Sequence, residues 1–177
     1  MLTNMRPIIL LFFFGLSAIV SGCATQASTP YSSTSLPSTL SIAKQQQLIN
    51  SIQQQHVQVV QRGDRLRMIL PADIFFQPNS STLSTNNLST LTDIAELLRS
   101  YGHIPIQISG HSDHVNSEGV SSQLTTAQAQ NIAAYFWSRG IALADMKVSG
   151  DGNQHTIASD TTVDGSAMNR RVEINIH

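Results

Sequence analysis

The sequence predicts an α+β fold, a mixed β-sheet with two main helices on one face, preceded by a signal segment and a tether. Two observations predict this class. Segments with alternating apolar residues, typical of strands, are separated by segments whose apolar residues have helical spacing. The predicted order over residues 56–177 is strand-strand-helix-strand-helix-strand-strand, which is typical of helices packed on one face of a sheet.

The predicted strands begin with a hairpin. Residues 57–60 and 66–70 are rich in apolar side chains and flank the turn sequence Arg62-Gly63-Asp64. Residues 104–108 alternate as a strand, in which Pro105 favours a position near the strand start or at a sheet edge. A short strand at 146–148 and a final alternating strand at 172–176 complete the sheet.

Two main helices are predicted between these strands. The first covers residues 88–98 and ends near Gly102, because glycine is favoured just after a helix C-terminus. The second begins around Thr125, where Thr125 and Gln128 have the spacing of a capping box, and it ends at Gly140. Both carry an apolar row that can pack on the sheet.

The composition excludes several classes of protein. The chain has 177 residues, with Lys+Arg 10 against Asp+Glu 11 and a formal net charge of −1. Without an excess of cationic side chains to neutralise phosphates, binding to nucleic acid is not expected. The single cysteine, Cys23, excludes an internal disulfide framework and a cysteine-rich zinc site.

Residues 1–22 are predicted to be a lipoprotein signal peptide. Arg6 precedes the apolar run 7–20, which is shorter than the ~20 residues that a membrane span needs. The run ends in Val20-Ser21-Gly22-Cys23, which resembles the lipobox of bacterial lipoproteins. That resemblance implies acylation of Cys23, palmitate included, and export to the outer membrane because Ala24 follows. The alternative is an uncleaved anchor helix with a buried cysteine.

Residues 23–55 are predicted to be a tether. Its Ser/Thr/Pro-rich part, 24–41, buries too little apolar surface to offset chain entropy and is expected to be disordered. Residues 42–55 are rich in glutamine, and Leu48, Ile49 and Ile52 lie on one helical face. A short helix is predicted there, with a disordered Gln-rich segment as the alternative.

Two motifs indicate a family. Gly110-His111-Ser112-Asp113 directly follows the 104–108 strand, and Asn169-Arg170-Arg171-Val172-Glu173-Ile174 opens the last strand. Together with Phe75-Phe76 and Ser80-x-x-Leu83, they resemble the OmpA-like C-terminal domain family over about residues 57 to 177. That family includes the peptidoglycan-associated lipoprotein and the MotB stator domain. The low charge and the Gln-rich segment also resemble the DotK/IcmN lipoproteins of type IVB secretion systems.

The resemblance implies a ligand and the residues that bind it. The family binds the diaminopimelate side chain of the peptidoglycan stem peptide, whose free end has an ammonium and a carboxylate. Asp113 matches the family aspartate that takes the ammonium, although Ser112 replaces the common threonine before it. Gln128 stands where the family has an arginine for the carboxylate, and losing that charge weakens a pocket by roughly 1–3 kcal/mol. The alternatives are a turn role for Asp113 and a capping-box role for Gln128.

Three further positions complete the comparison with the family. Ser121 stands where the family often has an asparagine, and Asn79 lies in a segment that lines the family's pocket. Both are candidate peptidoglycan contacts. Arg170 and Arg171 are predicted to be structural, pairing with acidic residues near the sheet edge.

The sequence therefore predicts an outer-membrane lipoprotein that faces the periplasm, binds peptidoglycan and tethers an envelope assembly to the cell wall. The alternative is a structural subunit of an envelope-spanning secretion complex that does not bind the wall. Other envelope proteins are expected partners in both cases. No enzyme activity or cofactor is predicted, since the nucleophile motif Gly-x-Ser-x-Gly is absent from the sequence. A metal site built from His111, Asp113 and His114, with His155 or Asp151, is a further alternative.

Overall fold

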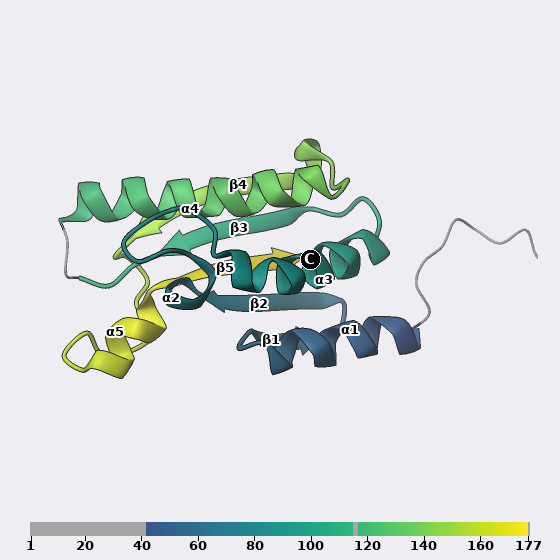
Figure 1. Ribbon diagram of the computed structural model, residues 1–177, viewed down its shortest axis with the longest axis horizontal. Coiled ribbons are helices and arrows are strands. Elements are labelled where there is room, and N and C mark those ends of the chain that lie inside the picture. The colour runs from purple at the N-terminus through teal and green to yellow at the C-terminus, as the bar shows by residue number, and fades with distance from the viewer. Residues whose placement is uncertain (1–41, 115–116, 177) are drawn as a thin grey trace, which may run out of the picture. The chain divides into compact units, whose positions relative to one another are not determined.

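The structure, a computed structural model, describes residues 42–114 and 117–176. The predictions for the signal peptide, for Cys23 and for the 24–41 tether lie outside these residues. Five strands form one sheet in the order β1-β2-β5-β3-β4 (Figure 1). The strands are β1 (Gln58–Arg62), β2 (Arg65–Pro71), β3 (Ile106–His111), β4 (Met146–Gly152) and β5 (Arg171–Ile176).

The sheet is mixed, as predicted. β3 and β4 are parallel, whereas β1–β2, β2–β5 and β3–β5 are antiparallel. β5 lies at the centre, so the motif that opens it is held between β2 and β3. The first residue of β3 is Ile106, and Pro105 precedes the ladder because proline has no N–H to donate to it.

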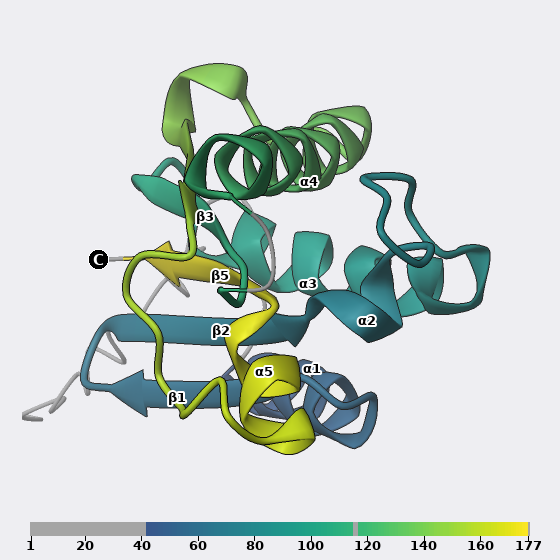
Figure 2. The ribbon, with the colours of Figure 1, turned by 90° about the vertical axis from the view of Figure 1, so that its left-hand side faces the viewer.

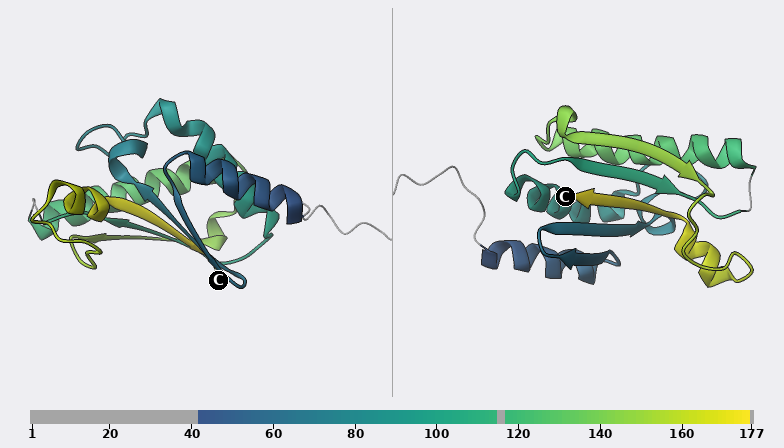
Figure 3. Two further views of the ribbon diagram at one scale, coloured as in Figure 1. Left: turned by 90° about the horizontal axis from the view of Figure 1, so that it is seen from below. Right: turned by 180° about the vertical axis from the view of Figure 1, so that it is seen from behind.

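The helices are α1 (Ile42–Gln54), α2 (Ala72–Phe75), α3 (Leu88–Ser100), α4 (Glu118–Ser138) and α5 (Val163–Asn169). Of these, α1, α3 and α4 cover one face of the sheet (Figure 2). The predicted short helix in the Gln-rich segment is present, and its apolar row is buried on α3, so the disordered alternative is wrong. Among the residues that the structure describes, no helix crosses the centre of the opposite face, and residues 153–162 link β4 to α5 beside it (Figure 3).

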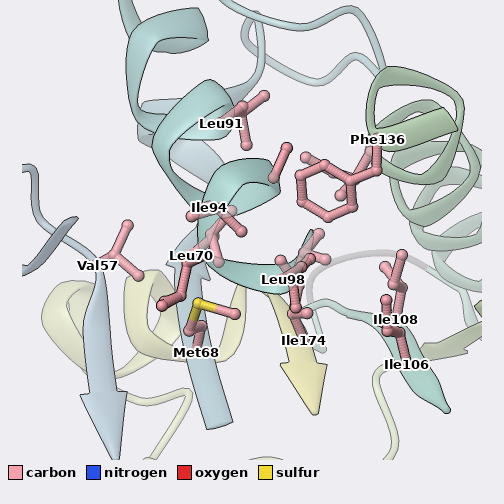
Figure 4. Close-up of a cluster of buried hydrophobic side chains, with 14 of the residues drawn as sticks. Val57, Met68, Leu70, Leu91, Ile94, Leu98, Ile106, Ile108, Phe136 and Ile174 are labelled. Carbon is pink, nitrogen blue, oxygen red and sulfur yellow. The ribbon is translucent and has the colours of Figure 1, made fainter. Parts of the chain in front are cut away.

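The core lies between the sheet and the helices α1, α3 and α4. Because strand side chains alternate between faces, every second residue of β2, β3 and β5 points toward the helices. The helices supply the facing apolar row at the spacing of 3.6 residues. The two sets meet in one buried cluster that includes Met68, Leu70, Ile108, Ile174, Leu91, Ile94, Leu98 and Phe136 (Figure 4).

The start of α4 differs from the prediction. The helix begins at Glu118, not around Thr125, so Gln128 is in its interior and the capping-box interpretation is wrong. Residues 118–124 contain glycine and serine, which favour helices only weakly and hid this start in the sequence. Close packing compensates, because Gly110 and Gly150 have no side chains and let the backbone at Thr125 and Thr126 approach the sheet.

No helix among the described residues is long and apolar enough to cross a membrane. Two elements were not predicted, the single turn α2 and the short α5. α2 contacts β2 and β5, and α5 ends directly before Arg170 and β5, so both lie at the end of the sheet where the second sequence motif begins.

Candidate functional site

A pocket of about 330 Å³ opens beside the carboxyl end of β3. A narrower extension of about 40 Å³ shares most of its lining and adds Gln128 and His111. This size suits the end of one amino-acid side chain better than a large cofactor. The pocket is lined by Asp73, Pro78, Asn79, Ser112, Asp113, Leu124 and Arg170.

The charged centre of the pocket is the guanidinium of Arg170, held between two carboxylates. Its Nε and Nη2 donate to the two oxygens of Asp73 at 2.9 and 2.6 Å, which is a bidentate pair. Its Nη1 donates to Oδ2 of Asp113 at 2.5 Å. The hydrogen bonds to Asp73, followed by those to Asp113, raise the pKa of Arg170 above its usual value. Two carboxylates against one guanidinium leave this cluster with a net charge of −1.

Burial differs sharply between the two carboxylates. The side chain of Asp113 is 4% exposed, whereas that of Asp73 is 50% exposed. A charge removed from water needs a close partner, since an uncompensated buried charge is costly. Arg170, at 32% exposed, bridges from the buried carboxylate to the open one. The pocket therefore presents a fixed negative group in its wall and a second one at its rim.

Backbone hydrogen bonds bring these three residues together. The Ala72 N–H donates to the Arg170 carbonyl at 2.9 Å, which joins the start of α2 to the residue before β5. The Ser112 N–H donates to the Gly152 carbonyl at 2.7 Å and fixes the chain next to Asp113. These two hydrogen bonds join segments that are distant in sequence and thus set the position of the ion cluster.

The side chain of Asn169 fixes the backbone directly before Arg170. It is fully buried, and its Oδ1 accepts from the N–H groups of Ile157 and Ala158 at 2.8 and 3.0 Å. Its Nδ2 donates to the Ala158 carbonyl at 2.9 Å and to Oδ1 of Asp160 at 2.7 Å. Four hydrogen bonds from one side chain tie the loop after β4 to the end of α5.

Gln128 lies in the narrow extension and is only 6% exposed. Its Nε2 donates to the Ser80 carbonyl at 3.1 Å, and Asn131 on the same helix donates to the Ser81 carbonyl at 2.7 Å. These bonds hold the loop that contains Asn79, whose φ of 52° is in the left-handed region that asparagine tolerates. Gln128 therefore supports the pocket wall in addition to lining it.

Of the predicted contacts, the structure brings Asp113, Ser112, Asn79 and Gln128 to this pocket. It places Ser121 elsewhere, fully buried in α4 and outside the pocket lining. Its hydroxyl has no hydrogen-bond partner within residues 42–114 and 117–176.

Three residues that line the pocket were not predicted from the sequence to be ligand contacts, namely Arg170, Asp73 and Leu124. Arg170 was predicted to pair with acidic residues, which is confirmed, but it also lines the pocket. Asp73 and Leu124 had no sequence signal, since a single carboxylate before Phe75 and one leucine in a helix have no distinctive spacing. The pairing of Asp73 depends on a residue that is distant in sequence and was therefore not visible.

Arg171 has the structural role that was predicted. Its Nε donates to Oε1 of Glu173 at 2.7 Å, and Nη2 of Arg67 donates to the same oxygen at 2.6 Å. Burial alone raises the pKa of Glu173, but the hydrogen bonds from Arg67 and Arg171 outweigh it and hold that pKa below its usual value. This network lies on the opposite face of the sheet from the helices, next to His111.

The residues of the metal alternative do not converge. Asp113 bonds to Arg170, and Nδ1 of His114 pairs with Oδ2 of Asp160. His111 is buried beside Glu173 and Asp151, and burial followed by the charge of Arg171 lowers its pKa. Within the described ranges, no group of three His, Cys, Asp or Glu residues could hold a metal ion.

Known proteins share this sequence pattern and fold. The sequence model of the OmpA family matches residues 75–170. The probable lipoprotein YiaD of Escherichia coli K12 is 29% identical over 120 residues, which cover 68% of this chain and 55% of YiaD. The peptidoglycan-binding protein ArfA of Mycobacterium tuberculosis H37Rv is 33% identical over 101 residues, covering 57% and 31%. The chain thus spans about half the length, or less, of these two relatives.

A solved structure has the same fold. It is described as the cell wall anchor of the T6SS from Pseudomonas aeruginosa and has a TM-score of 0.65 at 26% identity. The alignment covers 73% of this chain and 92% of that structure. The predicted α+β class and the predicted family are therefore confirmed, while the narrower resemblance to type IVB lipoproteins stays a prediction.

Proposed function

This chain belongs to the OmpA family, and we propose that it is an outer-membrane lipoprotein whose folded domain binds peptidoglycan non-covalently. The proposed anchor is an acylated Cys23, and the proposed ligand is the free end of diaminopimelate. In that arrangement the protein tethers an envelope assembly to the cell wall. The observation that carries the proposal is the ion cluster of Asp113, Arg170 and Asp73 in the wall of an open pocket.

The cluster has the groups that a zwitterion needs. A carboxylate offers about four lone-pair positions, so Asp113 and Asp73 can each accept from a ligand ammonium in addition to Arg170. A guanidinium has five N–H donors, and the bonds to Asp73 and Asp113 use three of them. The other two N–H groups lie on the nitrogens Nη1 and Nη2, where a planar ligand group can bind. Arg170 thus supplies the positive charge that the family resemblance places at position 128.

Burial and pre-organisation strengthen the proposed binding. Asp113 is nearly enclosed, and a ligand cation beside it interacts through a medium that screens less than water. The hydrogen bonds of Arg170 hold the carboxylates in position before a ligand arrives. Pre-organisation of this kind reduces the entropy that binding costs.

The relatives support the same function by name. One is a peptidoglycan-binding protein and the solved structure is a cell wall anchor, so we extend wall binding to this chain as part of the proposal. The lipid anchor is supported by the lipobox resemblance and by the relative named as a probable lipoprotein.

Cosedimentation with purified diaminopimelate-type peptidoglycan tests the proposal. The full-length chain, purified in detergent, is expected to sediment with the wall, and Asp113→Asn is expected to lose at least nine tenths of that binding. Glu96→Gln is the matched control, because it removes one carboxylate charge from an exposed pair with Lys44, and neither residue lines the pocket. If the Asp113→Asn variant sediments with peptidoglycan as well as the wild type does, the ion cluster is not the binding site.

One observation favours a second candidate, the structural subunit that does not bind the wall. Arg170 and Gln128 already form hydrogen bonds within the protein, so they can stabilise the fold without a bound ligand. If this is its role, the native chain stays in the supernatant with peptidoglycan while it copurifies with a large envelope complex.

A further inference from the structure

The orientation of the Gln128 amide is fixed by its partner. A backbone carbonyl can only accept a hydrogen bond, so the amide nitrogen, and not the oxygen, faces Ser80 at 3.1 Å. The amide therefore has Oε1 and one further N–H available for other partners. Because Gln128 lines the narrow extension, these are the groups that it can offer to a ligand there.

Arg170 lines the same extension and provides the complementary group. Its Nη nitrogens are hydrogen-bond donors, whereas Oε1 of Gln128 is an acceptor. A ligand group that fills this space is best matched when it has one acceptor for Arg170 and one donor for Gln128. A primary amide has both. An ionised carboxylate can accept from Arg170 and from the remaining N–H of Gln128, but it has no donor for Oε1 and would leave that oxygen unpaired.

The charge of the pocket points the same way. Asp73, Asp113 and Arg170 together have a net charge of −1, and Gln128 adds none. A free diaminopimelate end is a neutral zwitterion and leaves that excess negative charge in place. An ammonium beside a neutral amide has a charge of +1 and balances it.

From these two matches we infer that the pocket prefers a diaminopimelate end whose carboxyl group, next to the free amine, is amidated. The ammonium binds between Asp113 and Asp73. The amide carbonyl accepts from Arg170, and the amide NH2 donates to Oε1 of Gln128. This inference rests on the proposed function and specifies which chemical form of the stem peptide the site selects.

The direct test uses the native full-length chain and three soluble stem tripeptides. They end in diaminopimelate with its free-end carboxyl ionised, in the same residue with that carboxyl amidated, or in lysine, which has the amine alone. Isothermal titration calorimetry is expected to show about tenfold tighter binding of the amidated peptide than of the acid. Equal or tighter binding of the acid would overturn the inference, and so would lysine binding as tightly as the amidated form.

Two variants add a readout that a purely supporting role would not change. Gln128→Arg introduces a donor and a positive charge, so the preference should reverse toward the acid. Gln128→Met keeps the size but removes both polar groups, so the acid and the amide should bind more equally. A reversal is a change in ligand ranking and cannot arise from partial unfolding, while a Gln128→Arg protein that still prefers the amide would refute the role of Gln128.

The same experiment separates the two levels of the proposal. If neither diaminopimelate peptide binds and the protein fails to sediment with the wall, the proposed function is wrong. If both peptides bind but the acid is preferred, the pocket binds peptidoglycan and only the inferred preference for the amide is wrong.

Discussion

Substitution of Asn169 by alanine tests how the structure holds the ion cluster. The change removes four hydrogen bonds and leaves the N–H groups of Ile157 and Ala158 without their side-chain acceptor. Each such bond is worth about 1 kcal/mol net, and the loop can rehydrate in part, so the expected loss in the free energy of unfolding is about 2–4 kcal/mol. For a domain of this size that corresponds to a fall in Tm of about 10 °C.

Thermal unfolding followed by circular dichroism measures this loss, with Asn131→Ala as the matched control. Asn131 makes one hydrogen bond, from an exposed position to the Ser81 carbonyl, and its loss should cost under about 1 kcal/mol. Wall binding provides a second readout, because Asn169 immediately precedes Arg170 and its loss should weaken peptidoglycan binding as well. The reasoning fails if Asn169→Ala and Asn131→Ala have the same Tm within about 2 °C.

Three other predictions concern packing, pH and anchoring. Gly150→Ala would place a methyl group within 2.6 Å of Thr126 Cα and should lower the free energy of unfolding by about 3 kcal/mol or more, as measured by denaturant titration. The control Gly119→Ala, which has open space around the new methyl group, should leave that free energy unchanged or raise it. Burial lowers the pKa of His111 in the folded protein below the ordinary histidine value of 6.5. Below pH 6.5 the unfolded chain therefore binds a proton at His111 that the folded protein does not, so the free energy of unfolding should fall as the pH drops below 6.5. His111→Gln should flatten this slope in urea melts at pH 7 and pH 5, and an unchanged slope would assign the effect to other groups. Cys23→Ser should release the protein from membranes in a fractionation assay, and continued membrane retention would contradict the lipobox interpretation.

The strands and the family were predictable because their signals are local. The alternation of apolar and polar residues along 66–70 and 172–176 follows directly from strand geometry. Each of the two family motifs is a continuous stretch of sequence and can be read without the fold. The start of α4 was not predictable from local signals. Its first turns are stabilised by packing of α4 on the glycines of β3 and β4, and that contact joins residues that are distant in the chain.

The candidate site was predicted only in part for the same reason. Asp113 and Asn79 lie in motifs, but the partner of Asp113 is Arg170, which is 57 residues away in the sequence. The amide direction of Gln128 depends on the Ser80 carbonyl, which comes from a different loop. Sequence spacing identified the residue types, and the fold determined which atoms they present.

The two consecutive arginines show how the fold divides one motif between two tasks. Arg171 is the first residue of β5, and Arg170 comes directly before it in extended backbone, so their side chains point in opposite directions. Arg170 therefore reaches Asp73 and Asp113 in the pocket, while Arg171 reaches Glu173 in the buried network of the other face. Because β5 is the central strand, that network fixes the strand that directly follows Arg170. Arg171→Met should consequently lower the free energy of unfolding and weaken wall binding only as far as it unfolds the protein, because Glu173 keeps its bond from Arg67. Arg170→Met should abolish wall binding even under conditions where the variant is folded, and it also costs stability because the buried Asp113 carboxylate loses Arg170.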